Sequence, residues 1–231
     1  MFKIILLYSK ISKFSHINPI EKLVFCICCL IINSFSKNVT VPIINIIVFI
    51  VLNIIARNPL KYLVKLTLGM FIFSVFSSIT LVFDYGINFS MLLIVKTISS
   101  TLCLLFLSFT TPLDDILYYL YKINIARDVC DIIKSTEKFL ILIEDEYYIL
   151  YNSIKSRGGF ETKFLIIKNT ARLAALLLVN SMKRWSYIKD ALNSRCYNGY
   201  MPYIRSHSNL NYGRFTGMVT YIVCMVIIIL K

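Results

Sequence analysis

The chain has 231 residues, of which 58% are hydrophobic, and a single soluble domain of this size could not bury them all. Its 25 Lys and Arg exceed its 12 Asp and Glu, which gives a formal net charge of +13. Such a basic balance fits a nucleic-acid partner, but the long apolar runs favour a multi-pass membrane protein with positive charges in its cytoplasmic loops. We therefore expect the chain to lie in a lipid bilayer and to bind no nucleic acid.

Five stretches of the sequence are apolar and nearly free of charge, as membrane-crossing helices must be. They are residues 23–36, 38–56, 66–83, 89–110 and 215–230. A crossing helix needs about 20 such residues, so the first stretch is short and needs Lys22 and Lys37 to extend toward the two interfaces. Lys96 interrupts the fourth stretch, where it either reaches the nearby interface or serves as a functional charge within the membrane. The sequence thus predicts four membrane helices in residues 1–111 and a fifth in residues 215–231.

The charges between these stretches predict the orientation of the helices, because cytoplasmic loops carry an excess of Lys and Arg. The N-terminal segment and the loop between the second and third stretches are basic, whereas the loops on the opposite side carry little charge. The first group is Lys3, Lys10, Lys13, Lys22, Arg57, Lys61 and Lys65, and the second is Lys37 and Asp84. We expect a cytoplasmic N-terminus in the cell membrane, and residues 112–214 then lie in the cytoplasm too.

Residues 112–214 predict one short helix and two long ones. Pro112 with Asp114 and Asp115 is typical of a helix start, and this short helix should end near Lys122. Residues 127–157 show apolar positions every three or four residues, which predicts a helix roughly 45 Å long that ends at Gly158. A second long helix is predicted for residues 163–194. Only residues 173–182 of it are free of charge, so we expect it to lie against the membrane domain or a partner rather than to cross.

Each long helix ends in a similar short motif. The first is Ser156, Arg157 and Gly158, and the second is Ser194, Arg195 and Cys196. The planar guanidinium of Arg binds carboxylates or carbonyls through two bonds and keeps its charge, and a small following residue lets a partner approach the backbone. The alternative is that each Arg only offsets the dipole of its own helix C-terminus.

The sequence around these motifs resembles a known family. Residues 180–185 and 191–199, which read Asn-Ser-Met-Lys-Arg-Trp and Ala-Leu-Asn-Ser-Arg-Cys-Tyr-Asn-Gly, resemble the second coupling motif of the T components of energy-coupling factor (ECF) transporters. Residues 151–159 resemble the first motif, residues 18–23 (Asn-Pro-Ile-Glu-Lys-Leu) resemble the family's start, and residues 110–112 resemble the beginning of its coupling domain. The spacing is most similar to the CbiQ type, which is associated with cobalt import.

This resemblance implies a fold, partners and a mechanism. The expected fold is all-α: a membrane domain (1–111), a coupling domain of one short and two long crossed helices (112–214) and a C-terminal membrane helix (215–231). The expected partners are two ABC ATPase subunits, whose grooves would receive Arg157 and Arg195, a substrate-binding S component of the CbiM kind, and a small CbiN-like subunit. The chain departs from the family pattern in having Ser rather than Ala before both arginines and Cys196 in place of Gly.

Other functions remain as alternatives. The chain could be a T component shared among vitamin S components, or a self-contained secondary transporter, which would need paired polar residues or broken helices at mid-membrane. An enzyme ranks last, because the sequence offers no credible catalytic set and no phosphate-binding loop, and we expect no cofactor. His16 and His207 have no ligand-type neighbours at metal-binding spacing. The acidic run of residues 144–146 is interpreted as a solvated face next to lysines, with proton or metal binding as the alternative.

Overall fold

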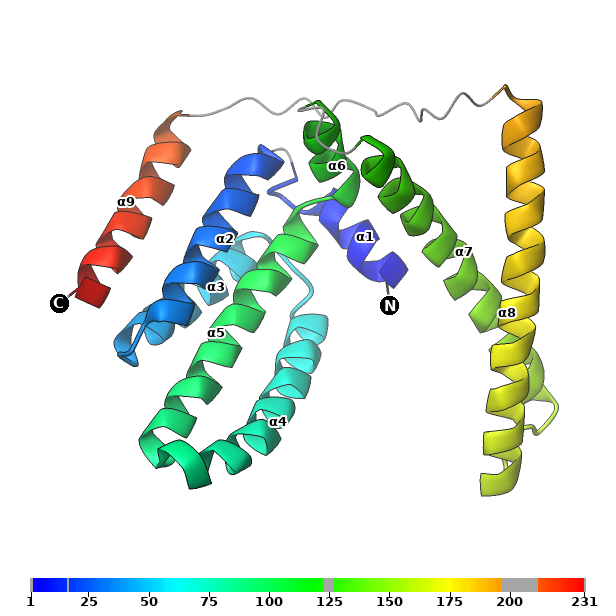
Figure 1. Ribbon diagram of the computed structural model, residues 1–231, viewed down its shortest axis with the longest axis horizontal. Helices are drawn as coiled ribbons and strands as arrows, with labels where there is room; N and C mark the ends of the chain where they lie inside the picture. Colours follow the sequence, from blue (N-terminus) through cyan, green and yellow to red (C-terminus); the bar gives the residue numbers. More distant parts are fainter. Residues whose placement is uncertain (1, 16, 123–126, 197–211, 231) are drawn as a thin grey trace. The chain divides into compact units, whose positions relative to one another are not determined.

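The computed structural model describes residues 2–15, 17–122, 127–196 and 212–230, and within these ranges the protein is helical with no strand (Figure 1). The helices are α1 (Phe2–Ile11), α2 (Pro19–Phe35), α3 (Thr40–Ile55), α4 (Leu60–Tyr85), α5 (Ile87–Thr110), α6 (Leu113–Lys122), α7 (Arg127–Ser156), α8 (Lys163–Ser194) and α9 (Tyr212–Leu230). The predicted all-α class is confirmed, and every helix predicted from the sequence is present. Helix α1 was not predicted, because Lys3 and Lys10 interrupt its apolar residues.

The contacts divide the chain into two compact units, which we describe separately. The bundle unit comprises Ile4–Tyr119 and Arg205–Lys231, and the hairpin unit comprises Met1–Lys3 and Leu120–Ile204. The bundle unit therefore contains α2 to α5, α9, and most of α1 and α6, whereas the hairpin unit contains α7 and α8.

Helix α5 is the centre of the bundle unit, because it packs against α2, α3 and α4. Its core side chains meet those of α2 and α3 in one buried cluster: Phe25, Cys26, Cys29, Phe49, Ala56, Leu102, Cys103 and Phe106. The rings of Phe49 and Phe106 lie 5.9 Å apart, and Phe49 is also 5.9 Å from Phe25. The three cysteines of this cluster act as small apolar side chains.

Helix α9 joins the bundle by packing against α2 and α3. Met225 is buried against Ile32 and Val41, and the hydroxyl of Tyr221 donates to Asn45 Oδ1. A polar bond between apolar helices removes two groups that lipid could not satisfy. The C-terminal helix is therefore held in the bundle by both an apolar and a polar contact.

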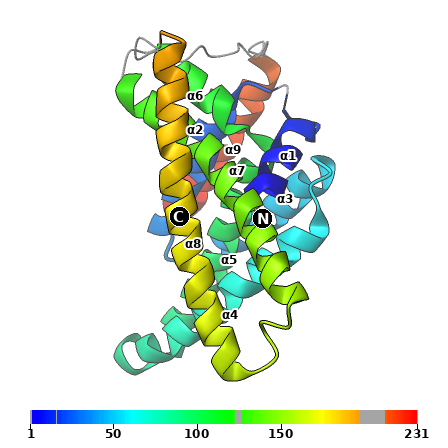
Figure 2. The ribbon, with the colours of Figure 1, turned by 90° about the vertical axis from the view of Figure 1, so that its right-hand side faces the viewer.

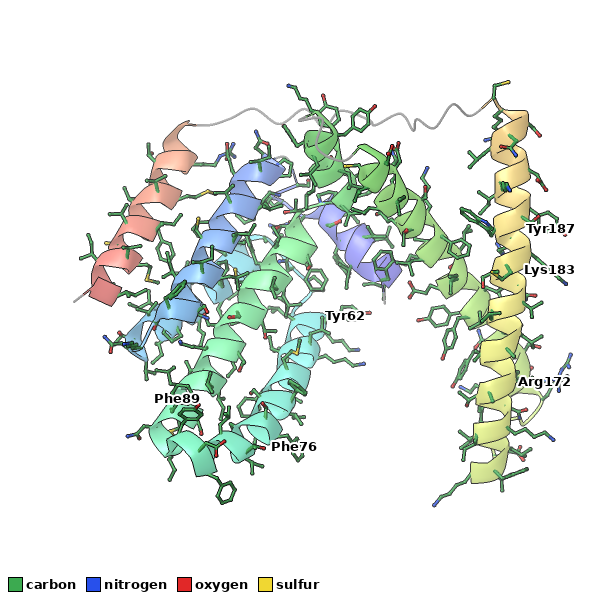
Figure 3. The ribbon with its side chains drawn as sticks, in the orientation of Figure 1. Tyr62, Phe76, Phe89, Arg172, Lys183 and Tyr187 are labelled. Atoms are coloured by element: carbon green, nitrogen blue, oxygen red, sulfur yellow. The ribbon has the colours of Figure 1, made fainter. Side chains whose placement is uncertain are left out.

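Apolar side chains cover much of the outside of the bundle unit. Helices α4 and α5 are long and apolar enough to cross a membrane, and α3 and residues Thr216–Ile229 are shorter apolar helices. On α4, the side chains of Phe73, Phe76 and Phe83 are exposed, and Figure 3 shows Phe76 projecting from the helix. So large an apolar surface is unfavourable in water, so this is a membrane protein. Helix α8 also meets the criteria of length and composition, and its placement beside the membrane stays a prediction.

Lys22 ties three parts of the bundle unit together. Its side chain is 2% exposed, and its ammonium group donates to the carbonyl of Phe14 (2.8 Å) and to that of Thr110 (2.7 Å). Thr110 is the last residue of α5, where carbonyls lack partners within the helix and a positive charge is favoured. The segment after α1 and the end of α5 are thus both fixed to the start of α2. Burial raises the pKa of the nearby Asp115 carboxyl, and the charge of Lys22 lowers it in part.

Lys96 makes a contact that neither of its two sequence interpretations described. Its ammonium group donates to the carbonyl of Ser34 at 2.9 Å, near the end of α2, and Asn33 Nδ2 donates to the carbonyl of Lys96 at 3.1 Å. The charge therefore binds the C-terminal turn of a neighbouring helix, which is a structural use of a Lys side chain.

Replacing Lys22 tests this arrangement. Lys22→Met keeps the length of the side chain but leaves two buried carbonyls without donors, so we expect the free energy of unfolding to fall by about 2 kcal/mol. Lys61→Met, at an exposed position of α4, should change it by less than about 0.5 kcal/mol. Thermal unfolding in detergent measures both. Equal midpoints for the two variants would contradict the anchoring role of Lys22.

Candidate functional site

Both predicted motifs lie at the C-terminal ends of the long helices of the hairpin unit. Ser156 ends α7 and Ser194 ends α8, and each is followed by an exposed Arg. The structure therefore places Arg157 and Arg195 at helix ends, as the sequence predicted. A helix leaves its last four carbonyls without partners inside the helix, so the conformation of the following residues decides how each motif is presented.

In α7 the chain turns back on its last carbonyls through a glycine. Gly158 has φ = 70°, in the left-handed region that glycine adopts without steric cost. Its amide donates to the carbonyl of Lys155 (3.1 Å), and the amide of Gly159 donates to that of Ile154 (3.0 Å). This pair of bonds is the Schellman ending of a helix. It leaves Arg157 directly after the last helical residue, with an exposed side chain.

At the end of α8, Cys196 takes the position of the glycine and makes the matching first bond of such a turn, whereas residue 197, which would make the second, lies outside the described residues. Cys196 has φ = 53°, and its amide donates to the carbonyl of Asn193 at 3.1 Å. A left-handed residue with a Cβ costs about 1 to 2 kcal/mol more than glycine. The replacement of Gly by Cys196 therefore keeps the geometry of the turn and adds strain, with the thiol exposed.

The serines of the two motifs also behave alike. Ser156 Oγ donates to the carbonyl of Ser153 (3.0 Å), and Ser194 Oγ donates to that of Asp190 (2.8 Å). Each hydroxyl is thus bonded within its own helix, as is common for Ser in helices. Both hydroxyls thus bond carbonyls of their own helices.

Close packing after the first motif explains the second glycine. A Cβ on Gly159 would lie 2.8 Å from the carbonyl oxygen of Ile154 and 2.9 Å from Asn169 Nδ2. Asn169, on α8, donates to the carbonyl of Gly159 at 2.6 Å, and the rings of Tyr151 and Phe160 stack at 5.1 Å. The turn between α7 and α8 is therefore tightly built on both sides.

Glu146 joins α7 to α8 at a point that we call the crossing contact, formed by Glu146, Asn180 and Arg184. One carboxylate oxygen accepts from Asn180 Nδ2 at 2.9 Å and the other from Arg184 Nη2 at 2.5 Å. Figure 1 shows the two helices diverging toward the N-terminal end of α7, and Figure 2 shows their axes inclined to each other. The pair is therefore crossed, as the family resemblance implied.

The crossing contact lies at the same chain distance from both motifs. Arg157 follows Glu146 by eleven residues (146 to 157), and Arg195 follows Arg184 by eleven (184 to 195). At 1.5 Å per residue, each arginine is about 16 Å along its helix from the contact. Figure 3 shows Lys183 and Tyr187 on the side of α8 that faces away from α7.

The acidic run of residues 144–146 differs from its sequence interpretation in one member. Asp145 pairs with the ammonium group of Lys3 at 2.8 Å, and Glu144 accepts from the Lys3 amide, so these two agree with an acidic face next to a lysine. Glu146 instead serves the crossing contact, with a side chain 15% exposed. Its partners lie 34 and 38 residues away in the sequence, on another helix. The only sequence signal for the pairing is that Glu146 and Arg184 each precede a motif arginine by eleven residues.

In the described ranges, no group of three or more His, Cys, Asp or Glu side chains is placed to hold a metal ion. His16 and His207 lie outside the described residues.

Comparisons with known proteins agree on one family. The model of the CbiQ family, described as "Cobalt transport protein", matches residues 11–204. The chain is 24% identical to an uncharacterized protein of Methanocaldococcus jannaschii, over 86% of this chain and 82% of that protein. It is also 22% identical to a putative fused cobalt transport protein CbiMQ of Methanocorpusculum labreanum, over 78% of this chain and 34% of that protein.

Cys196→Gly should stabilise the end of α8. Glycine adopts the left-handed conformation freely, so we expect a gain of about 1 kcal/mol in local stability and about fivefold slower amide exchange in the last turn. Cys196→Ala is the matched control, since it removes the thiol and keeps the Cβ. Hydrogen exchange followed by mass spectrometry measures both, and an equal gain in the two variants would assign the effect to the thiol instead.

The crossing contact predicts energetic coupling between Glu146 and Arg184. A double-mutant cycle with Glu146→Gln and Arg184→Gln should give about 1 kcal/mol, since the Arg side chain is 43% exposed and solvent weakens the pair. Thermal unfolding in detergent supplies the four stabilities. The cycle of Glu146→Gln with Lys183→Gln is the control, and coupling of the same size there would count against a specific pair.

Proposed function

Because the chain belongs to the CbiQ family of cobalt transport proteins, we propose that it is the membrane coupling subunit of an ATP-driven importer, the T component of an ECF transporter. In this proposal, the N-terminus and residues 112–214 lie in the cytoplasm, and residues 1–111 and 215–231 lie in the membrane. The chain carries out no reaction itself. It transmits motion from two ATPase subunits to a substrate-binding S component.

The observation that carries this proposal is the matched ending of α7 and α8. Two exposed arginines stand at two helix C-termini, each followed by a residue in the left-handed conformation. A guanidinium that only offset the dipole of its own helix would need neither a matching partner nor an equal distance from the crossing contact. Two equivalent arginines suit two equivalent acceptors, and a pair of identical or similar ATPases offers these.

The proposed mechanism uses the stiffness of the hairpin unit. Each ATPase would receive one motif in a groove that supplies carboxylate or carbonyl acceptors for the guanidinium. When the ATPases close on ATP, the two docked helix ends must move together, and the crossing contact converts this movement into a change of the angle between α7 and α8. The S component, which we expect to rest on this pair, would then tilt and release its cargo.

The cargo in this proposal is a cobalt ion, held by a CbiM-like S component with a small CbiN-like subunit. The fused relative supports such a partner, because its name joins two parts and the chain corresponds to only about a third of its length. The metal is a substrate here, and its ligands belong to the S component rather than to this chain.

Charge reversal at the two motifs tests the coupling role. In cells that also express the candidate ATPases and S component, Arg157→Glu with Arg195→Glu should abolish co-purification of the ATPases and lower uptake of radioactive cobalt at least tenfold. Loss of a buried Arg anchor costs about 2 kcal/mol or more of binding free energy at an interface. Each single variant should retain part of the binding, since one docking site remains.

The matched control is Lys168→Glu with Arg172→Glu, which reverses two exposed charges on α8 outside both motifs. This variant should bind the ATPases and take up cobalt normally. Normal assembly and uptake in the double motif variant would overturn the proposal, and uptake without any ATPase subunit would identify a self-contained transporter.

A further inference from the structure

A cavity of about 420 Å³ lies in the bundle unit, between the end of α1 and the turn that joins α3 to α4. It is lined by Tyr8, Ile11, Ser12, Lys13, Ala56, Arg57 and Asn58. Its volume is within the range of small-molecule sites. The lining combines two cationic side chains with two hydroxyls and an amide, and it includes no carboxylate. This chemistry favours an anion that accepts several hydrogen bonds.

Arg57 is held in a conformation that favours another residue type. Its φ is 56°, in the left-handed region, and its amide donates to the carbonyl of Ile54 at 3.0 Å. Glycine adopts this conformation without the steric cost that a Cβ brings. A strained backbone conformation at a residue other than glycine indicates that its side chain has a function. Arg57 lines the cavity, where its guanidinium can bind an anion.

The turn around Arg57 is rigid. The amide of Asn58 donates to the carbonyl of Asn53 (3.2 Å), its side chain donates to Asn53 Oδ1 (2.8 Å), and Asn53 Nδ2 donates to the carbonyl of Phe49 (2.7 Å). Asn58 is 6% exposed. The backbone position of Arg57 is therefore set in advance, so little ordering is needed when an anion binds.

Exposed apolar side chains occur in the cavity lining and two residues from it along the chain, at Ile54 and Leu60. The turn connects the ends of two apolar helices, since α3 ends at Ile55 and α4 begins at Leu60. Ile11 lines the cavity and is 76% exposed, and Ile54 and Leu60 are also exposed. A site for a free anion would gain nothing from these side chains. A lipid would cover them with its chains while its phosphate faced Lys13 and Arg57.

We propose that this cavity binds the headgroup of an anionic phospholipid. Its phosphate accepts hydrogen bonds from Arg57, Lys13 and the hydroxyl of Ser12, and its acyl chains lie along Ile11 and Leu60. Basic pockets at the ends of membrane helices recognise anionic headgroups in this way. Free phosphate shares the headgroup chemistry, and the experiment separates the two sources.

The decisive variant is Arg57→Gly, because it removes the cation and also relieves the strain, so a loss of binding cannot be due to a failure to fold. Wild type and variant are purified in detergent micelles that contain phosphatidylcholine, with and without phosphatidylglycerol, and their unfolding midpoints are measured. We expect phosphatidylglycerol to raise the midpoint of the wild type, since a ligand of the folded state stabilises it. Arg57→Gly should start from a higher midpoint and lose this increment.

Native mass spectrometry gives the second measurement. Retention of phosphatidylglycerol should fall at least tenfold in Arg57→Gly with Lys13→Gln and stay unchanged in Lys61→Gln, which removes an exposed lysine of α4 that does not line the cavity. A full phosphatidylglycerol increment in Arg57→Gly, or an equal effect of the two lipids on the wild type, would overturn the proposal. An equal stabilisation by inorganic phosphate alone would overturn it as well, by showing that the anion is not a lipid.

Discussion

A helix cannot pair its own last carbonyls, and three helices of this protein meet that constraint in the same manner. Helices α3, α7 and α8 each turn back through one left-handed residue: Arg57, Gly158 and Cys196. In each case an arginine stands at or beside that residue, at the end of the helix. The ends of helices are thus where the protein presents fixed positive charge, and both proposed binding functions depend on it.

The bundle unit solves a related problem, because polar groups inside a membrane protein must find partners within the protein. Lys22 does so for the end of α5 and Lys96 for the end of α2. Both bind carbonyls, so the two lysines fix helix ends through hydrogen bonds to the backbone. The same principle explains why a basic chain with few acidic residues can place lysines among apolar helices.

The sequence predicted the helices well where charge marks their limits. Lys22, Lys37 and Asp84 lie near the ends of the apolar runs, and the apolar period of residues 127–157 identified α7. The sequence did not predict α1, because Lys3 and Lys10 interrupt the apolar residues of this short amphipathic helix. Asn58 and Pro59 mark the turn between α3 and α4, but the left-handed conformation of Arg57 could not be predicted, since arginine seldom adopts a positive φ. The crossing contact depends on the relative placement of two helices, which local periodicity does not determine.

The two motifs occupy positions that the sequence located and the structure explains. Arg157 and Arg195 could be selected because the same short motif occurs twice, and Gly158 indicated how the first helix ends. Only the structure shows that Cys196 adopts the same left-handed conformation as Gly158, because cysteine seldom has a positive φ. The role of these residues in binding ATPases rests on the family and remains a proposal.

The crossing contact also fixes a mechanical ratio. Each arginine lies about 16 Å from it along its own helix, so the two arms between contact and motif have equal length, and the turn at Arg157 joins one of them to the start of α8. If the ATPases displace both arginines, as proposed, a rotation of about 10° about the contact would carry each arginine about 3 Å. Equal arms mean that the two ATPases would contribute equally to such a movement.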